Sequence, residues 1–125
     1  MERTTRSIND LGHGFLESIY RKAFGLILRD LGLEFKEEFP IEVFYRGKSL
    51  GEFRMDLLVE SCVIVELKAM KNIEQAHERQ LTNYLRSTNL EVGLLFNFGP
   101  RPQFRRLIFD NDRKQQPLAS AAAIP

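Results

Sequence analysis

Charged side chains interrupt two apolar runs of this chain, at positions where packing alone would favour valine or isoleucine. Asp56 stands in the run over residues 53–59. Glu66 and Lys68 stand in the run over residues 63–69, and because residues i and i+2 of a strand share a face, their side chains project the same way. Carboxylates that bind a divalent metal, beside an ammonium that stabilises negative charge, suit phosphodiester hydrolysis. The pattern predicts a metal-dependent phosphodiesterase site.

Phosphodiester hydrolysis needs an activated water and stabilisation of the phosphoryl and leaving oxygens. Mg²⁺ held by hard oxygen ligands serves these needs, and we expect it as the cofactor, with Mn²⁺ as an alternative. Asp56 and Glu66 are the candidate ligands. The backbone carbonyl of Leu67 is a third candidate, because it lies between the two site residues of its strand. Lys68 is expected to position the attacking water or to stabilise negative charge in the transition state.

The connection between the two runs decides whether this site can form. A two-residue turn through Glu60 and Ser61 would put Asp56 and Glu66 on opposite sides of the sheet. A three-residue turn over residues 60–62, or a bulge, would put Asp56 opposite Glu66 and on its face. We predict this second register, because a shared metal needs both carboxylates on one side.

The length and composition indicate a soluble globular protein. The chain has 125 residues, and we expect one domain over residues 1–118 and a short disordered tail over residues 119–125. Apolar residues make up 43% of the chain and charged residues 28%, which is typical of globular proteins. The formal net charge of +1 argues against a protein that coats nucleic acid by bulk electrostatics, so any contact with a polyanion is local.

Cys62 is the only cysteine, so no internal disulfide can form, and it lacks the Cys and His neighbours of a structural zinc site. This favours the reducing cytoplasm. No segment approaches the roughly 18 apolar residues of a membrane span, and the N-terminus leads into no apolar signal region. We therefore expect a cytoplasmic protein that is neither secreted nor inserted in a membrane.

Hydrophobic periodicity predicts two amphipathic helices. The first covers residues 15–31, and Gly32 ends it. The second covers residues 73–86, with Asn72 as its N-cap. The apolar stripe of the first helix is expected to contain Leu16, Tyr20, Ala23, Phe24, Ile27 and Leu31.

Five segments rich in β-branched and aromatic residues predict strands, at residues 39–45, 51–59, 63–69, 92–98 and 104–109. The first three suggest an antiparallel meander, with a turn at Arg46-Gly47-Lys48 between the first two. The fourth has the composition of a strand buried on both faces, and the fifth is expected at an edge of the sheet. The order α-β-β-β-α-β-β defines a small α/β fold with a mixed central sheet.

Polar side chains also fall within the apolar stripes of the predicted helices. Glu17 lies along the stripe of the first helix, and a metal shared with the strands would compensate its burial. His77 and Gln80 lie within the stripe of the second. Gln80 and Tyr84, at i and i+4, are neighbours that can reach a phosphate or orient Lys68. The alternative for each is a polar residue at the edge of the core that the backbone satisfies, and for His77 alone we favour that alternative.

Several motifs together resemble those of a known family. They are GFLESIY over residues 14–20, GEFRMDLLV over 51–59, VIVELKA over 63–69, QLTNYL over 80–85 and VGLLFNFG over 92–99. The first matches the signature of the GxxExxY proteins, small bacterial proteins placed in the PD-(D/E)xK nuclease superfamily. The likeness covers residues 8–109, and the motifs are specific only in combination.

The resemblance implies a restriction-endonuclease-like core. On the matching positions it implies principal metal ligands at Asp56 and Glu66, an auxiliary ligand at Glu17 and the catalytic lysine at Lys68. Gln80 and Tyr84 look like the Gln-x-x-x-Tyr element of the RecB-like branch of the superfamily. Tyr20 of the signature is a candidate supporting or substrate-binding residue.

Three functions follow as hypotheses. The first is a Mg²⁺-dependent nuclease that acts on DNA, with a protein partner or a second copy of the chain as a further expectation. The second is a catalytically silent nucleic-acid-binding or interaction module within a DNA repair, defence or mobile-element complex. The third is an unrelated structural protein in which Asp56, Glu66 and Lys68 form a simple ion-pair cluster. The resemblance argues against the third.

The last predicted strand is basic. Arg105 and Arg106 lie beside the aromatic Phe104, where they can contact phosphates while the ring stacks on a base. They equally fit an ordinary solvated edge strand, which charge protects from pairing with other chains. The sequence favours neither interpretation.

Overall fold

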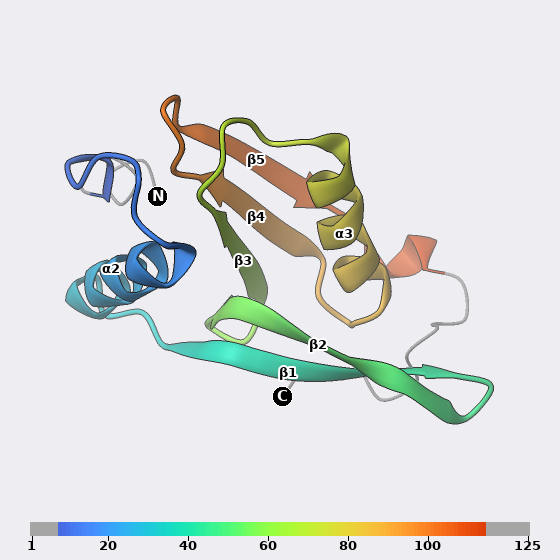
Figure 1. The fold of residues 1–125 in the computed structure, drawn as a ribbon. Helices are drawn as coiled ribbons and strands as arrows, with labels where there is room; N and C mark the ends of the chain where they lie inside the picture. The colour runs from blue at the N-terminus through green and yellow to red at the C-terminus, as the bar shows by residue number, and fades with distance from the viewer. Residues whose placement is uncertain (1–7, 115–125) are drawn as a thin grey trace.

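The structure is a computed structural model that describes residues 8–114, in which a five-stranded sheet has a helix on each face (Figure 1). Its elements are α2 (Glu17–Asp30), β1 (Phe35–Tyr45), β2 (Lys48–Val59), β3 (Val63–Lys68), α3 (Gln75–Arg86), β4 (Val92–Asn97), β5 (Gln103–Ile108) and the short 3-10 helix η1 (Asn111–Arg113). Within residues 8–114, no helix is long and apolar enough to cross a membrane. The tail predicted over residues 119–125 and the predicted domain end at residue 118 lie outside the described residues.

The sheet follows the chain order β1-β2-β3-β4-β5. The first three strands form an antiparallel meander, β3 and β4 are parallel, and β5 runs antiparallel to β4 at the edge. Parallel neighbours need a long crossover connection, which α3 supplies here. The mixed sheet, the meander and the edge position of the last strand confirm the fold predicted from the sequence.

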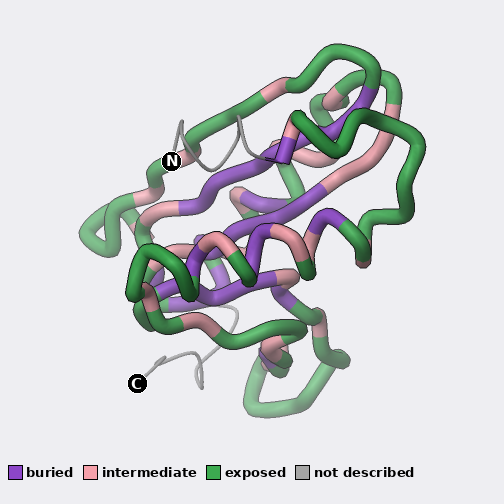
Figure 2. The backbone as a smooth tube through the Cα atoms, turned by 90° about the vertical axis from the view of Figure 1, so that its left-hand side faces the viewer, coloured by how far each residue is buried: buried purple, intermediate pink, exposed green. Residues whose placement is uncertain are grey.

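Each helix covers a different face of the sheet. Phe24 of α2 belongs to one core cluster with Val65 of β3, whereas Leu81 of α3 belongs to a second cluster with Ile64. Adjacent residues of a strand project from opposite faces, so the two clusters lie on opposite sides. Most of β3 and β4 is buried, as predicted for the fourth strand, whereas β5 is exposed or half-buried (Figure 2). β3 and β4 are therefore the most completely buried strands of the sheet.

The first helix is shorter than the predicted range of residues 15–31. It begins at Glu17, because Leu16 has an extended backbone with φ −67° and ψ 152°. Leu16 is 75% exposed and Leu31 48% exposed, so both lie outside the buried stripe in which the sequence placed them. Gly32 follows the helix with φ +75°, a conformation that glycine adopts without strain, and it ends the helix as predicted.

The second helix begins two residues later than predicted. Its N-cap is Glu74 and not Asn72, and it ends at Arg86 as predicted. The backbone N–H of Ile73 donates to Oε1 of Gln103 at 2.7 Å, which holds this residue against β5 and outside the helix. A contact between residues far apart in the sequence therefore overrides the local capping preference of Asn72.

The strands also differ from the prediction at their ends. β1 starts four residues early, because Phe35 pairs with Val59 and lengthens the hairpin. The tight turn consists of Arg46 and Gly47, with φ +52° and +75°, while Lys48 already belongs to β2. Each of the last three strands ends one residue before its predicted end. These shifts leave every predicted site residue on its predicted element.

Candidate functional site

A three-residue turn joins β2 to β3. Val59 pairs with Val63 across residues 60–62, and the first two residues of this turn have φ of +53°. This pairing confirms the predicted register. The pairing runs to Leu57 opposite Val65, and in the same register the next position places Asp56 opposite Glu66.

At this position, carboxyl oxygens of side chains accept the hydrogen bonds that backbone carbonyls accept elsewhere between β2 and β3. The N–H of Asp56 donates to Oε1 of Glu66 at 3.3 Å, and the N–H of Leu67 donates to Oδ2 of Asp56 at 2.8 Å. The backbone pairing ends one residue earlier, at Leu57 and Val65. The two carboxyl groups thus take the place of backbone carbonyls where β2 diverges from β3 (Figure 1). We call this position the strand fork, defined by Asp56 and Glu66.

Glu66 is a buried acid. It is 6% exposed, and burial is the main cause that raises its pKa to about 9. The charge of Asp56 and the hydrogen bond with its side chain raise the pKa further, whereas the Asp56 backbone N–H and the charge of Lys68 lower it. Glu66 therefore keeps its proton at pH 7. The hard oxygens of this pair fit Mg²⁺ or Mn²⁺, whose positive charge would oppose both the burial cost and the repulsion.

The raised pKa of Glu66 makes the stability of the metal-free protein depend on pH. The ordinary pKa is 4.5 and the folded one about 9, so the folded state holds an extra proton between these values. The free energy of unfolding must then fall as pH rises through this range. Since one pKa unit corresponds to about 1.4 kcal/mol, we expect Glu66→Gln to be more stable than the wild type by at least about 1 kcal/mol at neutral to mildly alkaline pH.

Thermal unfolding in a chelator, repeated at several pH values, measures this difference. It should disappear in acid, below the ordinary pKa of a glutamate, and grow with pH. Glu42→Gln, which removes an exposed carboxylate from β1, serves as the matched control and should show no such trend. A difference that stays constant with pH would contradict the protonated state of Glu66.

Tyr84 of α3 lies near the strand fork. Its pKa rises to about 12, first because of burial and then because of the negative charges of Glu66 and Asp56. Its ring stacks on Phe53 of β2, with centroids 3.9 Å apart and planes 2° from parallel. The Tyr84 hydroxyl stays protonated at neutral pH and is a hydrogen-bond donor at the site. Sequence reasoning missed Phe53, because an aromatic residue in an apolar run looks like an ordinary core residue.

Lys68 is half-buried on the same strand as Glu66, two residues away and on the same face. Its charge lowers the pKa of Glu66, so the ammonium acts on the carboxyl group through space. The structure therefore brings together Asp56, Glu66, Lys68 and Tyr84.

Glu17 does not join these residues. It is exposed in the first turn of α2. That helix packs on the face of β3 that carries Val65 and Leu67, whereas Glu66 projects from the opposite face. Within residues 8–114, no three His, Cys, Asp or Glu side chains form a group that could hold a metal. An auxiliary metal-binding role for Glu17 stays a prediction that this arrangement does not support.

Tyr20 has a structural role in this fold. It is fully buried, and its ring stacks on Phe98 with centroids 4.9 Å apart. Its hydroxyl donates to the carbonyl of Gly12 at 2.7 Å and lies 3.3 Å from the N–H of Phe15, which donates to it. These bonds fasten the loop before α2 onto the helix. The conformation of the signature segment thus depends on Tyr20.

Replacing Tyr20 with phenylalanine tests this role. Tyr20→Phe should lower the free energy of unfolding by about 1 kcal/mol, because two backbone groups lose a partly buried partner. Urea unfolding measures the change, with Tyr45→Phe on the exposed part of β1 as the control. Any activity measured on folded protein should be unchanged. Loss of activity without loss of stability would contradict the structural role and make Tyr20 a site residue.

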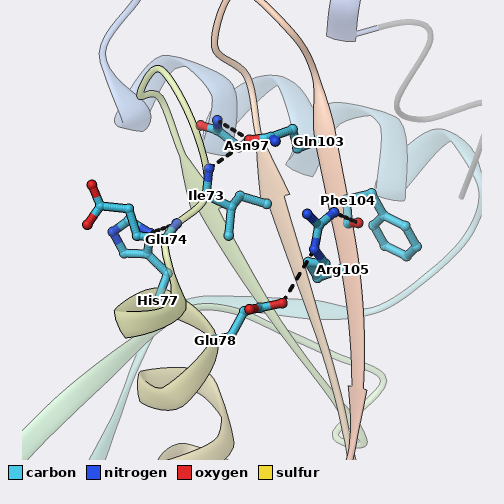
Figure 3. A network of polar contacts seen from close by, with 8 residues as sticks. All are labelled: Ile73, Glu74, His77, Glu78, Asn97, Gln103, Phe104 and Arg105. Carbon is cyan, nitrogen blue, oxygen red and sulfur yellow. Dashed lines mark hydrogen bonds and ion pairs between the residues drawn. The ribbon is translucent and has the colours of Figure 1, made fainter.

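The other candidates on α3 differ in their surroundings. Nδ1 of His77 accepts the N–H of Glu74 at 3.0 Å, within the capping box of the helix (Figure 3). This hydrogen bond favours the alternative interpretation of His77, a polar residue satisfied by the backbone. Gln80 is exposed one turn before Tyr84, and its contact with a substrate stays a prediction.

The basic residues of β5 are not equivalent. Nε of Arg105 forms an ion pair with Glu78 of α3 at 3.4 Å, and Nη1 donates to the carbonyl of Phe104 at 2.9 Å (Figure 3). Arg106 is exposed on the same strand. For Arg105 these contacts favour the interpretation as part of an ordinary edge strand. A phosphate contact by Arg106 stays a prediction.

Comparison with known proteins gives a match to a family model and matches to solved structures. The model of the PD-(D/E)XK nuclease superfamily matches residues 1–107. A solved structure, described as the crystal structure of SSO0001, is similar with a TM-score of 0.57 and 20% identity over 74% of this chain. The match covers 50% of that chain, so this chain spans about half the length of that protein, and at this identity the likeness shows the fold alone. A search of curated proteins finds no match.

Proposed function

The chain belongs to the PD-(D/E)XK nuclease superfamily, and from this premise we propose that it is a metal-dependent nuclease that hydrolyses phosphodiester bonds of DNA. The observation that carries the proposal is the strand fork, where Asp56 and a buried Glu66 meet with Lys68 on the same face. Membership of the GxxExxY proteins and of the RecB-like branch stays a resemblance, and the cytoplasm is the predicted location.

Asp56 and Glu66 would hold the metal, with the carbonyl of Leu67 and water as further ligands. Carboxylate oxygens are the donors that Mg²⁺ and Mn²⁺ prefer. When bound, the ion supplies Lewis-acid stabilisation of the phosphoryl and leaving oxygens and lowers the pKa of a bound water. Because Glu66 is buried, bulk water would screen the charge of the bound ion only weakly.

Two further side chains would act on the substrate. The ammonium of Lys68 stabilises negative charge on the phosphoryl oxygens or holds the attacking water. The protonated hydroxyl of Tyr84 can donate to a phosphate oxygen beside the acids. Both groups lie on the α3 side of the sheet, so the scissile phosphate is proposed to enter from that side.

A catalytically silent nucleic-acid-binding or interaction module is the second candidate, and one observation favours it. The carboxyl groups of Asp56 and Glu66 already accept hydrogen bonds from the backbone, as a purely structural pair would. Such a module would act with a protein partner in a DNA repair, defence or mobile-element complex. It predicts DNA binding without cleavage.

A cleavage assay separates the two candidates. Wild-type protein and Asp56→Asn are incubated with labelled single-stranded DNA, double-stranded DNA and RNA, each with Mg²⁺, Mn²⁺ or chelator. We expect DNA cleavage in metal only and its loss in Asp56→Asn, whereas Asp112→Asn, which removes an exposed carboxylate of η1, should cleave like the wild type. Binding without cleavage in either metal would identify the silent module. Cleavage that persists in Asp56→Asn would belong to another site or a contaminant.

A further inference from the structure

A buried amide fastens the segment that follows Lys68 to the end of β4. Asn97 is 1% exposed. Its Oδ1 accepts the N–H of Met70 and its Nδ2 donates to the carbonyl of Met70, both at 2.9 Å. The side chain thus pairs with the backbone of Met70 much as a neighbouring strand would. The sequence contains a sign of this role, since Asn97 is the single amide in the apolar run over residues 92–98.

A second amide extends this connection to the start of α3. Oε1 of Gln103 accepts the N–H of Ile73 at 2.7 Å and the Nδ2 group of Asn97 at 3.3 Å (Figure 3). Ile73 directly precedes the N-cap Glu74. Asn97 and Gln103, which we call the amide clamp, therefore hold both ends of the segment between the lysine and the helix that carries Tyr84.

The backbone of Lys68 is fixed by the same end of β4. Lys68 is the ladder partner of Asn97, and its carbonyl accepts the N–H of Phe98 at 2.8 Å. A Cβ at Gly99 would lie 1.9 Å from the carbonyl oxygen of Met70, so the approach of the two segments requires glycine. A lysine side chain is long and flexible, and the place of its ammonium depends on the backbone from which it projects.

We propose that Asn97 is a positioning residue, which holds Lys68 in the place that phosphodiester hydrolysis requires. The inference rests on the proposed nuclease function. Without the Asn97 amide, Met70 in the segment after Lys68 loses both of its hydrogen bonds to that side chain. Asp56 and Glu66 would keep their places, because they are bonded to each other's strands. The loss of Asn97 should therefore impair catalysis and spare metal binding.

A buried amide that only stabilises the fold would behave differently. Both roles predict a lower stability for variants of Asn97, because buried polar groups lose their partners. A purely structural role changes the fraction of folded molecules and leaves kcat per folded molecule unaltered. A positioning role lowers kcat in fully folded protein and leaves KM unchanged. The split between kcat and KM thus distinguishes them.

The test compares the wild type with Asn97→Ala and Asn97→Asp under conditions where circular dichroism shows each protein to be folded. The aspartate variant can still accept the N–H of Met70, but it replaces the donor with an oxygen that faces the Met70 carbonyl. We expect kcat for DNA cleavage to fall by about tenfold to a hundredfold in both variants. KM and the calorimetric affinity for Mn²⁺ should be unchanged.

Asn111→Asp is the matched control. Nδ2 of Asn111 also donates to a backbone carbonyl, that of Asn89 at 3.0 Å, but it lies in η1 and outside the clamp. This variant should cleave DNA like the wild type. An unchanged kcat in the Asn97 variants, or a parallel loss of Mn²⁺ affinity, would overturn the positioning role.

Hydrogen exchange separates failure of this inference from failure of the proposed function. Without DNA or metal, the amides of Met70 and Ile73 should exchange faster in Asn97→Ala than in the wild type or in Asn111→Asp. Unchanged exchange would refute the clamp, whether or not the protein is a nuclease. A wild type that cleaves no DNA would refute the nuclease function, while faster exchange would still support the clamp.

Discussion

Lys68→Ala should lower kcat for DNA cleavage by about a hundredfold to a thousandfold, the effect of removing one group that stabilises transition-state charge. The ammonium lies on the face of β3 that carries Glu66, and its charge acts on that carboxyl group. Its loss raises the pKa of Glu66 further, which opposes metal binding, but also removes a positive charge that repels the ion. The two effects oppose each other, so metal affinity should change little.

Single-turnover cleavage, with saturating enzyme in excess over DNA, measures the chemical step for Lys68→Ala. Lys71→Ala is the matched control, since Lys71 is an exposed lysine three residues further along the chain. It should retain wild-type kcat, with at most weaker DNA binding at high salt. Equal kcat in wild type and Lys68→Ala would mean that the lysine only balances charge at the strand fork.

Metal binding should displace the proton of Glu66, and this is the second large effect. The pKa of about 9 in the metal-free protein means that the carboxyl group is protonated at neutral pH. A ligand must be deprotonated to bind the ion, so binding releases a proton. At pH values below that pKa, the affinity for Mn²⁺ should therefore increase about tenfold for each unit by which the pH is raised.

Calorimetric titration with Mn²⁺ in two buffers of different ionisation enthalpy counts the protons released. About one proton per ion is expected near neutral pH. Glu66→Gln should bind the ion weakly and release none, whereas Glu42→Gln on the exposed part of β1 should resemble the wild type. Tight binding with no proton release would place the metal elsewhere on the molecule.

Much of the fold could be predicted, because it depends on local patterns. Alternation and apolar runs located all five strands, and the requirement for a shared face predicted the register that the pairing of Val59 with Val63 confirms. The prediction failed where distant residues decide the local structure. Gln103 holds Ile73 out of α3, and no pattern near Asn72 carries that information.

Local patterns also predicted part of the candidate site, and the rest depends on contacts between distant residues. Asp56, Glu66 and Lys68 stand out because charge is costly in an apolar run. Helical periodicity showed which side of α2 carries Glu17, but not against which face of the sheet that helix packs. The roles of Tyr20 and Asn97 depend on backbone groups of Gly12 and Met70, which a one-dimensional pattern does not bring together.

The rate of Mg²⁺-dependent DNA cleavage by the wild type and by Glu66→Gln, measured side by side, tests the central claim most directly. The substitution keeps the shape of the side chain and should stabilise the metal-free fold, so unfolding cannot explain a loss of activity. We predict cleavage by the wild type that a chelator abolishes, and a rate at least about a thousandfold lower in Glu66→Gln. Equal rates in the two proteins would contradict the assignment of the strand fork as the metal site.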